Sequence, residues 1–388
     1  MNHISQYLDV SPDSVHLFWK GRVGLFAILK ALDVQEDDEV IIPAFTCVVV
    51  ANAIIYCGAK PIYVDINPSN LQYNPTKLKQ AISPKTKVII AQNTFGIPAD
   101  YKILKDICSS EGIICIEDAT HGLGTRYENQ KYPPNFVKAS FYSFQWNKPL
   151  SAGIGGLVYC SDKALNKNIT ALNQDLVKPS FKEISLLRLQ LLIRPLINHP
   201  QIYSWGVALF RMLSKMGIVV GSSQAVEMES TKQPKHFFKG ISAVQRKKVN
   251  QQIGQLDQLI AKRQQQYSKY DQLFKSLDLY RLKVADKDHS ALKFPIFVKD
   301  KSTFLKLASK AGIKLGDWMN SPIHPVEQHW ENWFYNAGTA PVAEKYAQHI
   351  LNLQTDLGAK EFKSTLAFIV RNKAQFIPAG PSFLKGVD

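Results

Sequence analysis

The sequence predicts an α/β protein with a mainly parallel sheet covered by helices on both faces. Between residue 13 and about residue 160, short apolar runs alternate regularly with helical stretches. The runs are rich in β-branched residues and have few polar interruptions, which is typical of strands buried on both faces. After about residue 240 the pattern changes, and strands and helices there indicate a smaller α+β domain.

The expected elements of the first part follow one another in order along the chain. Each strand is a short apolar run, and each helix shows apolar residues at helical spacing. Strands are expected at 15–19, 40–42, 61–64, 88–91, 113–116, 139–143 and 156–159. Helices are expected at 23–32, 48–56, 77–82 and 102–110.

Two domains are predicted, a large one at 1–239 and a small one at 240–388. Within the large domain, 161–235 breaks the alternation and reads as a basic, apolar helical insertion. It contains two apolar helical patterns, 184–193 and 202–216, separated by a proline-bounded break. In the small domain a long helical pattern runs to about Phe274. A strand at 291–298 and helices at 302–311, 341–350 and 360–370 follow it.

Bulk composition limits the class of protein and its partners. The 388 residues carry a formal net charge of +15, which favours an anionic partner such as a phosphorylated small molecule, nucleic acid or a lipid surface. No nucleic-acid-binding module is visible, so nucleic acid is not expected. Five scattered cysteines indicate reduced thiols. The sequence shows no signal peptide and no run of about 18–20 apolar residues, which a membrane span requires. We therefore expect a cytoplasmic protein.

The residues that follow the strands form a chemically informative set. In parallel sheets, ligands bind beyond the carboxyl ends of the strands. Asp118 and His121 follow one strand, Lys148 follows the next, and Gly21-Arg22 lies between a strand and a helix, where an anion is favoured. Alone, such an aspartate is usually a helix cap, such a lysine a surface residue and such a glycine a turn residue.

Together these groups match the needs of pyridoxal phosphate (PLP). A lysine can form a Schiff base with the cofactor aldehyde, and an acid can keep the pyridine nitrogen protonated. An anion-binding turn can hold the phosphate. The order and spacing of the three groups therefore indicate a PLP site.

The span from about Gly21 to Gly156 resembles the DegT/StrS family of sugar aminotransferases. Matching stretches are DDEVIIPAFTCVVVANAIIYCGAKPIYVDI, AISPKTKVII, FGIPAD, IEDATHGLG and SFQWNKPLSAGIGG. Weaker matches continue as SAVQ…QLDQLIAKR and PVAEKYAQHILNL, so the resemblance covers most of the chain outside 161–235. It implies the PLP-transferase fold type I, with a seven-stranded sheet in the large domain.

The resemblance also implies roles for individual residues. Lys148 resembles the Schiff-base lysine that shuttles a proton, Asp118 the acid at the ring nitrogen, and His121 a residue beside the ring and its phenolic oxygen. Further cofactor contacts are implied for Gly21, Arg22, Val23, Cys47, Asn93 and Ser143.

Three of these positions leave alternatives open. Arg22 stands where the family has a small residue and could contact the phosphate directly. Cys47 stands where an aromatic ring often covers the cofactor, a role that Phe45 or Trp146 could take over. His324 and Trp318 resemble a small-domain segment that approaches the sugar nucleotide, although His324 could equally be a loop histidine. No metal site is expected.

The resemblance implies amino transfer from L-glutamate to a keto sugar that is carried on a nucleotide. Such a product would enter surface polysaccharide or glycan biosynthesis, and a homodimer is expected. The alternative is a catalytically idle PLP-fold protein that binds or regulates at the membrane surface. Residues 180–220 would then lie peripherally on anionic lipid at the inner face of the membrane, or else form a core or dimer contact.

Overall fold

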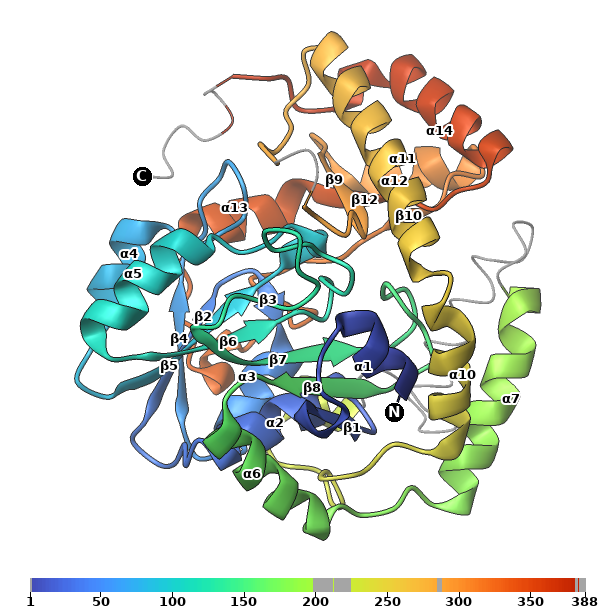
Figure 1. The fold of residues 1–388 in the computed structure, drawn as a ribbon. Coiled ribbons are helices and arrows are strands. Elements are labelled where there is room, and N and C mark those ends of the chain that lie inside the picture. Colours follow the sequence, from blue (N-terminus) through green and yellow to red (C-terminus); the bar gives the residue numbers. More distant parts are fainter. Residues whose placement is uncertain (1, 198–211, 213–224, 285–287, 381–382, 384–388) are drawn as a thin grey trace.

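The computed structural model describes residues 2–197, 212, 225–284, 288–380 and 383 (Figure 1). The expected helix at 202–216, with its basic residues Arg211 and Lys215, therefore lies outside the described residues apart from residue 212.

A seven-stranded sheet forms the centre of the large domain, with strand order β1-β8-β7-β6-β5-β2-β4 (Figure 1). Neighbouring strands from β7 to β4 are parallel, and β8 runs antiparallel to both β1 and β7. The prediction of a mainly parallel sheet is therefore confirmed. The strands are β1 (Val15–Phe18), β2 (Glu39–Pro43), β4 (Lys60–Val64), β5 (Thr86–Gln92), β6 (Ile114–Asp118), β7 (Val137–Ser143) and β8 (Gly156–Cys160).

Helices cover both faces of this sheet because its strands are apolar on both sides. Val40 and Ile42 of β2 join the core under α2 (Gly21–Ala31), α3 (Val48–Ile55) and α6 (Lys163–Leu172). Ile41, between them, joins the core under α4 (Pro75–Ala81) and α5 (Tyr101–Glu111). Towards β1, the second face is covered by α1 (Asn2–Leu8) and α10 (Ala243–Ile253).

The C-terminal part has its own three-stranded antiparallel sheet, ordered β10-β12-β9. Its strands are β9 (Lys293–Phe297), β10 (Leu315–Gly316) and β12 (Ile350–Gln354). Its helices are α11 (Leu256–Ser276), α12 (Lys301–Lys310), α13 (Pro341–His349) and α14 (Ala359–Arg371). This part also reaches into the large domain, because β11 (Ile323–His324) pairs in parallel with β3 (Thr46–Cys47).

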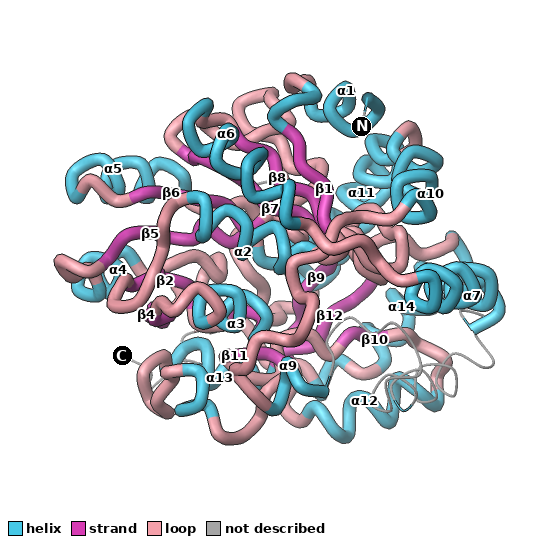
Figure 2. Tube along the Cα trace, turned by 90° about the horizontal axis from the view of Figure 1, so that it is seen from below, coloured by secondary structure: helices cyan, strands magenta, loops and turns pink. Residues whose placement is uncertain are grey.

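The single long helix expected up to Phe274 is wrong, because the chain forms α10 and α11 with a break at Gly254 and Gln255. Glycine has the lowest helix propensity of the residues other than proline, so an interruption costs least at this point. Helix α7 (Phe181–Ile197) lies at the edge of the molecule in two views and includes the expected helix at 184–193 (Figures 1 and 2).

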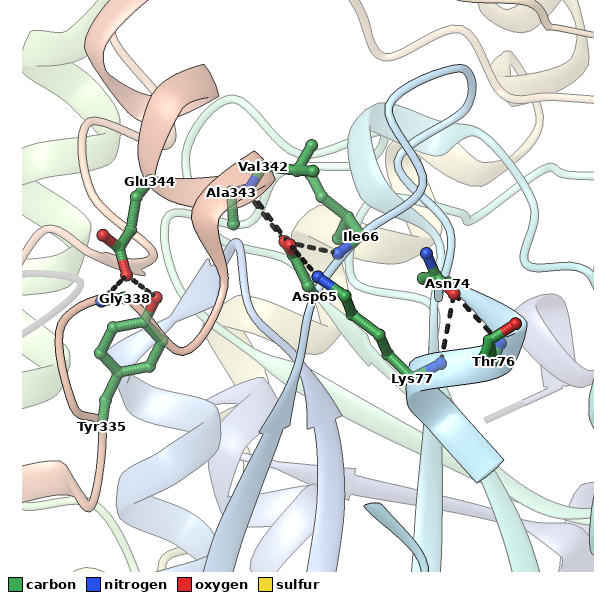
Figure 3. Close-up of polar contacts among 10 residues, drawn as sticks. All are labelled: Asp65, Ile66, Asn74, Thr76, Lys77, Tyr335, Gly338, Val342, Ala343 and Glu344. Atoms are coloured by element: carbon green, nitrogen blue, oxygen red, sulfur yellow. Dashed lines mark hydrogen bonds and ion pairs between the residues drawn. The ribbon is translucent and has the colours of Figure 1, made fainter. Parts of the chain in front are cut away.

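A buried carboxylate joins the two parts of the chain. Asp65 is 1% exposed and follows β4, and its oxygens accept hydrogen bonds from the backbone N–H groups of Val342 at 3.1 Å and Ala343 at 3.0 Å (Figure 3). It also accepts from Ile66 N–H at 2.9 Å and pairs with Lys77 at 3.4 Å. Asp65 therefore caps α13 from another element and fixes this helix on the sheet.

Replacing Asp65 with alanine should lower the free energy of unfolding by about 2–4 kcal/mol, because several hydrogen bonds to a buried carboxylate are lost. Urea denaturation would measure the change. Asp300→Ala is the matched control, since Asp300 caps α12 from an exposed position. That variant should cost only about 1 kcal/mol. Equal losses for the two variants would show that Asp65 is an ordinary cap.

Candidate active site

A cavity of about 670 Å³ lies beyond the carboxyl ends of β6 and β7 and beside the N-terminus of α2. It collects most of the residues that the sequence singled out. The predicted residues in its lining are Gly21, Arg22, Cys47, Asp118, His121, Ser143, Lys148, Trp318 and His324. Segments as far apart as residues 20–22 and 317–327 therefore meet at one site, as the rule for strand ends predicts.

Lys148 lies in the loop between β7 and β8. Asn147, just before it, has a left-handed backbone with φ of 64°, and the Lys148 N–H donates to the Gln145 carbonyl at 3.2 Å. The ammonium lies 4.7 Å from the centre of the Trp318 ring. Burial lowers the pKa of Lys148 to about 8, although the Asp118 carboxylate acts in the opposite direction. A substantial fraction of Lys148 is therefore a neutral amine near pH 8.

Capture of PLP by Lys148 should accordingly accelerate about tenfold per pH unit up to about pH 8 and then level off, since only the neutral amine attacks a carbonyl. Stopped-flow absorbance would follow the reaction. Free Nα-acetyl-lysine is the control, and its rate should continue to rise to about pH 10. If the protein followed the same curve as the free amine, the buried environment of Lys148 would have no effect on its reactivity.

Asp118 is the last residue of β6 and is 4% exposed. Its Oδ1 accepts a hydrogen bond from the Thr120 N–H at 2.9 Å. Burial raises the pKa of Asp118, while the Thr120 hydrogen bond and the charge of Lys148 lower it. A further cation beside Asp118, in addition to Lys148, would offset the free-energy cost of burying this carboxylate.

His121 stands between two aromatic rings. Its ring stacks on Trp318 with centroids 4.8 Å apart and on Phe95 at 6.2 Å. The Phe95 N–H donates to Nδ1 at 3.1 Å, so the proton of the neutral ring is on Nε2. Burial, followed by the charge of Lys148, holds the pKa of His121 well below its usual range. His121 is therefore a neutral hydrogen-bond donor in this site.

The start of α2 and the end of β7 form the anion-binding part of the cavity. A Cβ on Gly21 would lie 3.0 Å from the Tyr142 carbonyl oxygen and 3.2 Å from the Ser143 Cβ, so a larger residue would require this backbone to shift by a few tenths of an ångström. Arg22 and Lys20 add two cations to the cavity that Ser143 also lines. Two cations, a hydroxyl group and a helix N-terminus are suited to a phosphate group.

Two predicted residues do not line the cavity. The N–H of Val23 donates to the Lys20 carbonyl at 3.1 Å. The Asn93 amide donates to Glu117 at 2.7 Å and to the Tyr127 hydroxyl at 2.9 Å, and its carbonyl oxygen accepts from the Ala99 N–H at 3.0 Å. Asn93 thus belongs to a buried hydrogen-bond network around Glu117, next to Asp118 but outside the cavity wall.

The segment that contains Trp318 and His324 is brought to the cavity by strand pairing. His324 of β11 lies opposite Cys47 of β3. The His324 ring hydrogen-bonds Asn320, which also lines the cavity. Burial raises the pKa of the Cys47 thiol. Cys47 brings a small thiol to the cavity wall, and neither of the described residues Phe45 and Trp146 lines the cavity.

Sequence reasoning missed the contribution of α9 (Ala225–Glu229), which lies in the predicted insertion. Met228 and Glu229 line the cavity, and Glu227 forms an ion pair with Arg22 at 2.6 Å. Lys239, which follows this helix in the chain, forms an ion pair with Glu183 at 2.5 Å. The sequence contained one signal for this contact. Arg22 was expected at the start of a helix, and an arginine that is buried there requires a nearby anion.

The protein has an α/β scaffold, and one edge of its sheet carries a lysine amine, a buried carboxylate and a site suited to a phosphate group. This combination defines a class of protein. These groups are the ones needed to bind PLP. The chain belongs to the DegT/DnrJ/EryC1/StrS aminotransferase family, whose sequence model matches residues 18–184 and 212–362. The unmatched stretch between them, 185–211, is shorter than the insertion expected at 161–235.

Curated relatives with known activities align with part of the chain. A GDP-perosamine synthase from Vibrio cholerae is 35% identical over 158 residues, which are 40% of this chain and 43% of the relative. A UDP-2-acetamido-2-deoxy-3-oxo-D-glucuronate aminotransferase from Pseudomonas aeruginosa is 38% identical over 155 residues, 40% of this chain and 42% of the relative. The aligned stretches thus span less than half the length of these relatives.

Solved structures match the chain over almost its full length. DesV from S. venezuelae, in complex with a ketimine intermediate, superposes with a TM-score of 0.73 at 19% identity, covering 97% of this chain and 88% of that one. NtdA from Bacillus subtilis, with bound cofactor PMP, has a TM-score of 0.71 at 19% identity, covering 96% and 75%. The predicted fold type I of PLP-dependent transferases is confirmed.

Proposed function

We propose that this chain is a PLP-dependent aminotransferase that moves an amino group from L-glutamate to a nucleotide-linked keto sugar for surface polysaccharide or glycan biosynthesis. The observation that carries the proposal is the presence of the Lys148 amine and the Asp118 carboxylate in one cavity with a phosphate-type anion site. Family membership and the sugar substrates named for the two curated relatives support it.

The residues of the cavity suit the individual tasks of this reaction. PLP, when bound, supplies an aldehyde that accepts an amine and a ring that takes up negative charge from the substrate carbon. Lys148 would hold the aldehyde carbon through its neutral amine and would move the proton of the substrate carbon. Asp118 would hold a proton on the ring nitrogen. Gly21, Arg22 and Ser143 would hold the phosphate, and His121 would donate a hydrogen bond from Nε2.

Substrate binding is assigned to Trp318 and His324. Both line the cavity from the C-terminal part of the chain, opposite the strand ends that carry Asp118 and Lys148. The indole offers a flat apolar surface next to cationic groups, and the histidine offers a hydrogen-bond donor or acceptor for a sugar hydroxyl group. A nucleotide diphosphate on the substrate is consistent with the positive charge of the chain.

The direct test uses protein loaded with pyridoxamine phosphate and a panel of GDP- and UDP-linked keto sugars. We expect one member of the panel to restore the visible absorbance of the PLP form, with one amino sugar formed per site. L-Glutamate should then regenerate the pyridoxamine form and release 2-oxoglutarate. A protein that bound the cofactor but reacted with neither amine donor nor keto sugar would support the alternative of an idle binding protein.

We further propose that the protein is a homodimer and that α7 is part of the contact. This helix exposes the large apolar residues Phe181 (82%), Leu189 (52%) and Leu192 (75%), while Leu187 packs on Trp19 and Ile154 beside the cavity. Exposed apolar side chains of this size favour a contact with another surface. Among the residues that the structure describes, no helix is both long enough and apolar enough to cross a membrane.

Changing Phe181 and Leu192 to glutamate should weaken the dimer at least about tenfold, because buried apolar residues dominate such contacts. Sedimentation equilibrium would measure this, with Val370→Glu as the control, since Val370 is an exposed apolar residue of α14. Flotation with anionic vesicles separates the peripheral membrane alternative. An unchanged dimer together with flotation that the double variant loses would assign α7 to the membrane surface.

A further inference from the structure

The two cations of the anion-binding part of the cavity share one carboxylate that comes from α9. Glu227 is 2% exposed, and its Oε1 lies 2.6 Å from Arg22 Nη1. Its Oε2 lies 3.6 Å from Lys20 Nζ. Lys20 and Arg22 line the cavity, whereas Glu227 is absent from its lining. The carboxylate therefore contacts both cations without itself lining the cavity.

Glu227 is held in this place by its backbone as well as by its charge. The Asn52 side chain of α3 donates to the Glu227 carbonyl at 2.7 Å, and the Trp333 indole N–H donates to the Asn52 oxygen at 2.7 Å. Asn52 is fully buried and Trp333 is 1% exposed. This chain of hydrogen bonds fixes α9 on the core of the molecule, so Glu227 is a permanent neighbour of Arg22 and not a surface side chain in a chance contact.

The charges of this cluster have a consequence for a phosphate in the cavity. Two cations that lie close together and are largely shielded from water repel each other and lose hydration, and a carboxylate that contacts both offsets this cost. The same carboxylate reduces the attraction that Arg22 and Lys20 exert on a second anion. Burial lowers the pKa of Lys20 to about 8, and Glu227 acts in the opposite direction.

We propose that Glu227 is the built-in counter-anion of the phosphate site, which stabilises Arg22 and Lys20 in the absence of a phosphate and weakens the binding of the cofactor phosphate. Arg22 and Glu227 then form a functional pair. Glu227 would tune how readily PLP and pyridoxamine phosphate exchange at the site. The inference rests on the proposed cofactor, but it concerns the affinity for the phosphate group and not the chemistry at Lys148.

The test compares ligands with and without a phosphate group. Glu227→Gln keeps the shape of the side chain and removes its charge, so the dissociation constant for pyridoxamine phosphate should fall about tenfold. The constant for pyridoxamine, which lacks the phosphate, should stay within about twofold. Glu111→Gln, at an exposed position at the end of α5 and outside the cavity lining, is the matched control for the general loss of one negative charge. Its effect should be within about twofold for both ligands.

Two further arms make the result decisive. Inorganic phosphate should protect Glu227→Gln against thermal unfolding at about tenfold lower concentration than it protects the wild type. In an Arg22→Gln background, which removes the guanidinium group that Glu227 contacts, the gain from Glu227→Gln should largely disappear. This background keeps the inference testable if the single variant folds poorly.

The inference is overturned if Glu227→Gln weakens pyridoxamine phosphate binding, since Glu227 would then position Arg22 for the phosphate. Equal changes for pyridoxamine and pyridoxamine phosphate would also overturn it, because the role would be structural. Failure of the proposed function gives a different result. In that case the wild type would bind neither PLP nor pyridoxamine phosphate, while the inorganic phosphate arm would still report on Glu227.

Discussion

Replacing Lys148 with alanine should lower kcat for amino transfer at least about 10³-fold, because the variant loses both the nucleophile that captures the cofactor and the base that moves the proton. Arginine at this position keeps a charge but has no nucleophilic amine, so Lys148→Arg should be impaired to a similar extent. Formation of 2-oxoglutarate from L-glutamate in single-turnover experiments would measure the loss.

Lys138→Ala is the control for this experiment. Lys138 lies on β7, the same strand that leads to Lys148, but its ammonium pairs with Asp162 at 3.0 Å near the surface. The control should keep activity within about twofold of the wild type, as expected for an exposed ion pair. A Lys148→Ala variant that kept more than about one tenth of the wild-type activity would contradict the assigned role of the amine.

Replacing Asp118 with asparagine should lower kcat about 10²–10³-fold, a loss of about 3–4 kcal/mol of transition-state stabilisation. Asparagine can still accept the Thr120 hydrogen bond, but it cannot hold a proton on the ring nitrogen as a carboxylate does. The ring then accepts less charge from the substrate carbon. Measured kcat should fall much more than the affinity for L-glutamate.

Asp118→Glu is the conservative counterpart, because it keeps the charge and changes only the reach of the side chain. It should recover part of the activity that asparagine loses. Equal activities of the asparagine and glutamate variants would indicate that the geometry of Asp118 matters and that its charge does not. In that event the ring nitrogen would not need a protonating partner in this site.

The elements of the large domain were predictable because burial on both faces leaves a clear pattern. Apolar runs such as 88–91 mark β5, and the residues after the runs mark the cavity. Asp118, Lys148 and Gly21 were found in this way. The family resemblance added Trp318 and His324, which no local pattern would connect to residues far away in the chain.

Features that depend on tertiary contacts were harder to predict. The short strands β10 and β11 exist because they pair with β12 and β3, and a two-residue strand leaves no periodic signal. The Asn93 side chain looked free to reach the cofactor, but the buried Glu117 carboxylate needs its amide. Glu227 reaches Arg22 across more than 200 residues of sequence, so only the fold reveals this ion pair.

The most direct measurement is borohydride reduction of protein saturated with PLP, followed by peptide mapping by mass spectrometry. The structure predicts that the phosphopyridoxyl group is fixed on the peptide containing Lys148, and that Lys293, a second half-buried lysine near Trp318, stays unmodified. Cofactor fixed elsewhere, or no modification of Lys148 in saturated protein, would contradict the assignment of this cavity as the site of amino transfer.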